Sequence, residues 1–136
     1  MFMGDNLIDK RAYAFALRIV KAYKFLCRDK GEYVLSKQLL RSGTAIGALR
    51  REAKFAQSRA DFINKTSVAL KEANETLYRI GLLHDSGCFD DDAYSSIHGE
   101  AHEITSILVP VVKTTKANSM KYADDGFVRE DYFPDY

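Results

Sequence analysis

The chain has 136 residues, of which 46% are hydrophobic and 29% are charged, and its formal net charge at pH 7 is +1. This size and composition are typical of one soluble globular domain with a single core. The longest apolar run has only six residues, from Ile107 to Val112, so we expect no membrane span. Asp5 and Asp9 lie where a signal peptide would need an apolar run, so we expect no signal peptide. The only two cysteines, Cys27 and Cys88, form no CxxC pair, which argues against a disulfide framework or a zinc ribbon and indicates a cytoplasmic protein.

The first predicted element is an amphipathic helix that ends near Arg28. Apolar residues recur at steps of three and four, at Ile8, Ala12, Phe15, Ile19, Tyr23 and Leu26. Gly31 follows at a position where helices commonly end, and cations in the last turn suit the negative end of the helix dipole. Because the following loop is short, the next helix is expected to run antiparallel to the first.

The second predicted helix lies between Tyr33 and Gln57. Its apolar or small positions step by four and three, at Leu35, Leu39, Ser42, Ile46, Leu49, Ala53 and Ala56. Gly43 and Gly47 each cost on the order of 1 kcal/mol relative to alanine inside a helix. We favour close approach of a neighbouring helix as the compensation, and a kink at Ser42 and Gly43 is the alternative.

Two more helices and a tail complete the chain. Ser58 and Asp61 match a capping pattern that begins the third helix, whose apolar stripe continues to the glycine-containing stretch at 85–87. The acids at 90–92 suit the start of a fourth helix, in which Pro110 predicts a kink. From residue 119 to 136, five aromatic residues alternate with five acids and no helical period remains, so we expect an extended or disordered tail rather than a fifth element.

These elements predict an all-α protein, an antiparallel up-down-up-down four-helix bundle over residues 1–118 with an acidic-aromatic tail over residues 119–136.

Candidate catalytic and metal-binding residues are few. His98 and His102 lie four residues apart but lack the His-Glu-x-x-His order of zinc proteases, and no glutamate precedes a histidine by three residues as in di-iron bundles. His84 and Cys88 are one helical turn apart, at a predicted helix end. We expect no enzymatic activity, no cofactor and no metal.

Charge is distributed unevenly along the sequence. Residues 1–58 contain 12 Lys and Arg against 5 acids, whereas residues 90–136 contain 4 against 10. On the second helix, Lys37, Arg41 and Arg51 lie near one line, and Arg50 and Lys54 extend it. The first helix adds further cations, including Arg18 and Lys21. Arginine and lysine match phosphate oxygens, so this basic half is a candidate nucleic-acid surface, although such a charge run also occurs as an ordinary solvated helix face.

The block from Tyr33 to Gly87 contains a distinctive set of positions, Ser36, Gln38, Leu39, Arg41, Ser42, Ile46, Gly47, Glu52, Ala53, Ala60, Asp61, Phe62, Leu70, Glu72, Ala73 and Glu75. At these positions the block resembles a four-helix-bundle family encoded by intervening sequences in bacterial 23S ribosomal RNA genes, sometimes labelled S23. The pair Arg50 and Arg51 departs from the Asn-Ile commonly found there. The resemblance implies a homopentamer without known enzymatic activity. It also implies kinship with the accessory variability protein of diversity-generating retroelements, a basic pentamer that binds nucleic acid and a reverse transcriptase.

Two hypotheses therefore remain open. In the first, a homo-oligomer, pentameric by resemblance, binds RNA or DNA through its basic surface and also accepts a protein partner such as a reverse transcriptase. In the second, it is a structural or protein-interaction oligomer in which the basic surface pairs with the acidic fourth helix of a neighbour. We also expect the acidic tail to lie over a basic face, so that deleting residues 119–136 tightens nucleic-acid binding at low salt.

Overall fold

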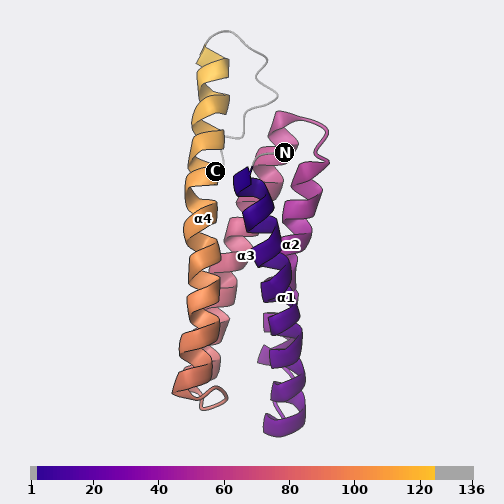
Figure 1. The fold of residues 1–136 in the computed structure, drawn as a ribbon, viewed down its shortest axis with the longest axis vertical. Coiled ribbons are helices and arrows are strands. Elements are labelled where there is room, and N and C mark those ends of the chain that lie inside the picture. The colour runs from indigo at the N-terminus through magenta and orange to yellow at the C-terminus, as the bar shows by residue number, and fades with distance from the viewer. Residues whose placement is uncertain (1–2, 125–136) are drawn as a thin grey trace.

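Four helices form an antiparallel up-down-up-down bundle in the computed structural model (Figure 1). The structure describes residues 3–124, and it describes side chains for residues 7–118. The helices are α1 (Met3–Lys30), α2 (Leu35–Lys54), α3 (Arg59–Asp85) and α4 (Asp91–Asp124). Neighbours in sequence pack closely, whereas α1 and α4 contact each other sparsely. The all-α bundle predicted from the sequence is confirmed.

Local hydrogen bonds explain where α1 ends and α2 begins. Gly31 has a φ of 61°, a left-handed conformation that glycine adopts without strain and that ends α1. The Glu32 carboxylate then accepts hydrogen bonds from the backbone N–H groups of Leu35 (3.1 Å) and Ser36 (2.7 Å). Burial acts to raise the pKa of Glu32, but these bonds and one from Val34 hold it below its usual value. This cap at the start of α2 was not predicted from the sequence.

The starts of the last two helices follow the expected capping chemistry. The Asp61 N–H donates to Ser58 Oγ at 3.0 Å, as the capping pattern predicts. The Ala93 N–H donates to Asp90 Oδ1 at 2.8 Å, which caps α4. The helix then continues through the exposed Pro110 to Asp124. It therefore extends past the boundary predicted at residue 118, and the rest of the predicted tail lies outside the described residues.

The glycines of α2 lie against α1. A Cβ atom on Gly43 would lie 2.8 Å from Cγ1 of the buried Ile19, which is closer than carbon atoms pack. A Cβ on Gly47 would lie 3.6 Å from the backbone of Ala12, an ordinary contact distance. Since α2 is also continuous from Leu35 to Lys54, close helix packing explains these glycines better than a break.

Candidate nucleic-acid interface

The structure separates the seven cations predicted from the sequence into three environments. Lys37, Arg41 and Arg51 are exposed on α2, and Lys54 and Arg50 contact α1. Arg18 and Lys21 belong to α1, where Arg18 is half-buried and Lys21 is exposed. These cations therefore do not form one continuous surface.

Arg50 corrects the sequence interpretation, because its side chain lies in the core with only 1% of its area exposed. Its Nε atom lies 3.4 Å from Asp9 Oδ1 on α1, and its guanidinium donates a hydrogen bond to Thr66 Oγ1 on α3 at 3.3 Å. A buried arginine with such partners is a structural group that a phosphate cannot reach. Arg50 is therefore not part of the candidate interface.

A signal for this burial was present in the sequence. Ser36, Gly43 and Arg50 are spaced seven residues apart, and all three are buried in the structure. A seven-residue spacing keeps side chains on one face of a helix, so Arg50 continues the line on which Gly43 meets α1.

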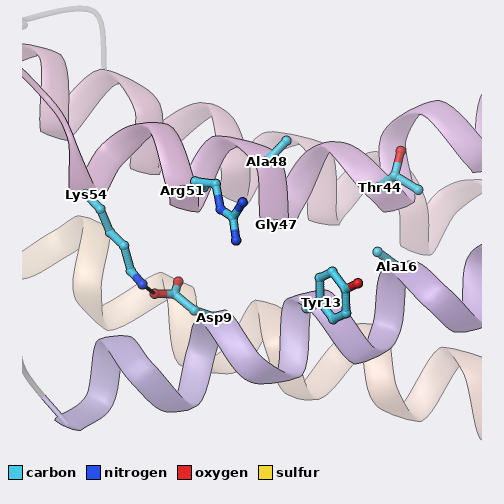
Figure 2. A pocket seen from close by; sticks show the side chains of 8 residues that line it. All are labelled: Asp9, Tyr13, Ala16, Thr44, Gly47, Ala48, Arg51 and Lys54. Atoms are coloured by element: carbon cyan, nitrogen blue, oxygen red, sulfur yellow. Dashed lines mark ion pairs between the residues drawn. The ribbon is translucent and has the colours of Figure 1, made fainter.

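Lys54 and Asp9 form the polar end of the contact between α1 and α2. Lys54 Nζ lies 2.8 Å from Asp9 Oδ2, the ion pair drawn as a dashed line in Figure 2. The carboxylate of Asp9 thus faces two cations, Arg50 and Lys54. Its negative charge is more than balanced locally.

Arg18 and Lys21 lie toward α4 rather than toward the outer face of α2. Arg18 forms an ion pair with Glu100 and donates to Ser96 Oγ at 2.6 Å. A second ion pair, between Arg11 and Glu103, also joins α1 to α4. Lys21 lines a hollow in this same seam with Arg18 and Asp90. The ion pair of Arg18 makes it a weak phosphate ligand, whereas Lys21 remains exposed.

A groove runs between α1 and α2, with a volume of about 340 Å³. We call it the α1–α2 groove, and it is lined by Asp9, Tyr13, Ala16, Thr44, Gly47, Ala48, Arg51 and Lys54. Figure 2 shows the Arg51 guanidinium pointing from α2 toward α1, between Asp9 and Tyr13. Among the residues that the structure describes, no carboxylate forms an ion pair with Arg51. The groove thus combines small residues, an aromatic ring and an available cation.

The α2 outer face consists of Lys37, Arg41, Thr44, Ala48 and Arg51, which follow one another at steps of four and three. Its three cations are exposed. From Lys37 to Arg51 the helix rises about 21 Å. Burial, and then the charge of Glu75, raise the pKa of Glu72 on α3. The positive charge of Arg41 opposes this rise. The α2 outer face is therefore a positive strip, and the pKa of the Glu72 carboxyl group beside it is raised.

The other candidate residues do not come together as a metal or thiol–histidine site in the part of the chain that the structure describes. The rings of His98 and His102 lie 6.4 Å apart, and within the described residues no three His, Cys, Asp or Glu side chains are grouped to hold a metal. Both ring nitrogens of His84 contact carboxylates, Asp85 Oδ1 at 3.0 Å and Asp91 Oδ1 at 2.7 Å, so neither is directed at Cys88. No helix in the described part of the chain is long and apolar enough to cross a membrane.

Comparisons with known proteins agree with this architecture. No curated protein sequence matches the chain. A solved structure from Bacteroides thetaiotaomicron, described as a protein with unknown function from the S23 ribosomal protein family, shares 50% sequence identity with it. The TM-score is 0.80, and the match covers 82% of this chain and 99% of the other. The sequence pattern of 23S rRNA-intervening sequence proteins matches residues 4–110. The chain therefore belongs to the 23S rRNA-intervening sequence protein family.

Proposed function

We propose that this protein is a non-enzymatic homo-oligomer that binds RNA or DNA through the phosphate backbone, using the α2 outer face. The observation that carries the proposal is the strip of exposed cations Lys37, Arg41 and Arg51 along one helix. Lys37 and Arg51 form no ion pair with any described residue, so a phosphate would not have to displace an existing partner.

The chemistry of the strip suits a phosphate backbone rather than particular bases. An arginine guanidinium donates two parallel hydrogen bonds to phosphate oxygens, and lysine supplies a point charge. Thr44 and Ala48 are small, so a backbone can approach the helix between the cations. The strip is about 21 Å long, which corresponds to roughly six base-pair steps of duplex. Such contacts give affinity and salt dependence without sequence preference.

Large exposed apolar side chains support self-association. They include Tyr33, Val34, Phe55 and Tyr78, with exposed fractions between 59% and 79%. Oligomer contacts bury such groups. A pentamer, which the family resemblance implies, would place five positive strips in one particle, and that multivalency would raise affinity for a long nucleic acid. Such a strip would also attract a negatively charged face of a protein partner such as a reverse transcriptase.

A purely structural oligomer is the second candidate. Its basis is the acidic start of α4, where Asp90, Asp91 and Asp92 are all exposed. In that arrangement the α2 outer face of one subunit pairs with these acids of the next, and the cations hold the assembly together instead of binding phosphate.

Charge reversal separates the two candidates. The test variant carries Lys37→Glu and Arg41→Glu, and the control carries Lys113→Glu, which reverses an exposed cation on α4. Filter binding to single-stranded RNA and to duplex DNA measures affinity, and sedimentation velocity measures assembly. We expect the test variant to lose binding and to keep its assembly, with the control unchanged. Loss of the oligomer would support the structural candidate instead, and absence of salt-dependent binding by the wild type would remove the nucleic-acid proposal.

A further inference from the structure

We propose that the α1–α2 groove is the docking site for residues 125–136 of its own chain, a segment that lies outside the described residues. This inference does not rest on nucleic-acid binding, because it concerns a peptide contact within the protein. It assigns an occupant to a groove that shares Thr44, Ala48 and Arg51 with the α2 outer face.

The groove offers an apolar surface with a cationic end. Tyr13 and Leu17 on α1 are 65% and 52% exposed, and a second hollow that contains Leu17, Ala14 and Lys10 continues from the groove across Tyr13. Small residues of α2 form the opposite wall, where Gly47 lies close to the α1 backbone. A surface of this kind accommodates aromatic side chains, since their rings bury a large area on a flat, small-residue wall.

The charges of the groove select an acidic occupant. Arg51 points into the groove, and no described carboxylate forms an ion pair with it. Asp9 is the acid in the lining, and Arg50 and Lys54 together outweigh its charge. The groove therefore presents net positive charge next to exposed apolar surface.

The segment 125–136 has the complementary composition. It contains four acids and one arginine, hence a net charge of −3, together with Phe127, Tyr132, Phe133 and Tyr136. Acidic residues directly precede the Tyr132 and Phe133 pair. This order would allow the aromatic pair to contact the apolar wall while the acids lie near Arg51.

The topology places the segment within reach. Because the bundle alternates in direction, α4 ends at the same end of the molecule as the start of α1 and the end of α2 (Figure 1). Asp9 and Lys54 mark the end of the groove that lies closest to it. Twelve residues can span at most about 40 Å, whereas the groove from Lys54 to Thr44 is about 15 Å long. A segment that fills the groove therefore keeps about 25 Å of reach for the path from the end of α4 to Lys54.

The test uses full-length chains and a fluorescein-labelled peptide of residues 125–136. The tail variant carries Phe127→Ser, Tyr132→Ser and Phe133→Ser, so its own segment no longer competes for the groove. Fluorescence anisotropy should show that the peptide binds the tail variant about tenfold more tightly than it binds the wild type, whose groove is occupied at a high effective concentration. Equal peptide affinities for the two proteins would overturn the proposal.

A second pair of variants locates the contact. Added to the tail variant, Arg51→Glu should weaken peptide binding about fivefold, whereas Lys37→Glu makes the same charge change outside the groove and should leave it within a factor of two. Tyr13→Ser provides an uncharged groove variant and should also weaken binding, with circular dichroism as the check on folding. Equal effects of Arg51→Glu and Lys37→Glu, or no effect of Tyr13→Ser, would show that the groove is not the site.

Discussion

Two adjacent arginines of α2 are predicted to respond in opposite ways to the same substitution. Arg50 is buried between α1 and α3, whereas Arg51 is exposed. Arg50→Glu removes the cation that faces Asp9 and puts a second carboxylate into a site where only 1% of the side chain is exposed. Arg51→Glu changes a side chain that forms no ion pair with a described residue.

The expected magnitudes differ clearly. Breaking a buried ion pair by removing one partner costs about 3–5 kcal/mol, because the remaining charge stays buried without compensation. Lys54 still faces Asp9 and offsets part of this cost. A typical domain has a total stability of about 5–15 kcal/mol, so Arg50→Glu should remove a large share of it. An exposed substitution such as Arg51→Glu should stay within about 0.5 kcal/mol of the wild type.

Urea denaturation followed by circular dichroism at 222 nm, at one fixed protein concentration, measures both effects. Arg50→Met is the matched variant, since it keeps an unbranched apolar stem and adds no negative charge, and it should lose less stability than Arg50→Glu. Equal denaturation midpoints for Arg50→Glu and Arg51→Glu would refute the assignment of Arg50 to the core.

Two further predictions concern helix packing and pH. Gly43→Ala should destabilise the protein by up to about 2 kcal/mol, because overpacking against Ile19 outweighs the gain in helix propensity, whereas Gly47→Ala should stabilise it by about 0.5–1 kcal/mol in the same urea titrations. If both substitutions stabilise, the contact of Gly43 with Ile19 is not tight. The hydrogen bonds that the His84 ring donates to Asp91 and then to Asp85 raise the pKa of His84. The stability that protonated His84 contributes is therefore complete below the pKa of the unfolded chain, near 6.5, and is lost as pH rises through the higher pKa of the folded protein. The thermal midpoint of the wild type should therefore exceed that of His84→Gln by more at pH 5.5 than at pH 8.5, and a difference that does not change with pH would contradict the contact of His84 on α3 with Asp91 at the start of α4.

The fold could be predicted from the sequence because its determinants are local and periodic. Ser58, Asp61 and Gly31 act on neighbouring backbone groups, so their roles can be recognised within a few residues. Apolar residues that recur every three or four positions indicate which face of each helix packs into the core. The end of α4 was harder to predict, since it extends past the other helices in Figure 1 and requires no apolar stripe there.

The candidate interface was predicted only in part, because its composition depends on contacts between distant residues. Arg18 pairs with Glu100, 82 positions further along the chain, and the sequence alone assigns no such partner. Arg50 and Arg51 are chemically identical, and only their positions on the helix, together with Asp9 on α1, decide which of them is buried. The α1–α2 groove likewise arises from two helices that meet at Gly47.

The salt dependence of binding to single-stranded RNA tests the central claim most directly. For three phosphate contacts by Lys37, Arg41 and Arg51, the logarithm of the association constant should fall with the logarithm of salt concentration with a slope of about −2 per subunit engaged. The variant with Lys37→Glu and Arg41→Glu should lose about 1.4 of that slope, and the Lys113→Glu control should lose none. An affinity that is independent of salt, or an unchanged slope in the double variant, would contradict the account.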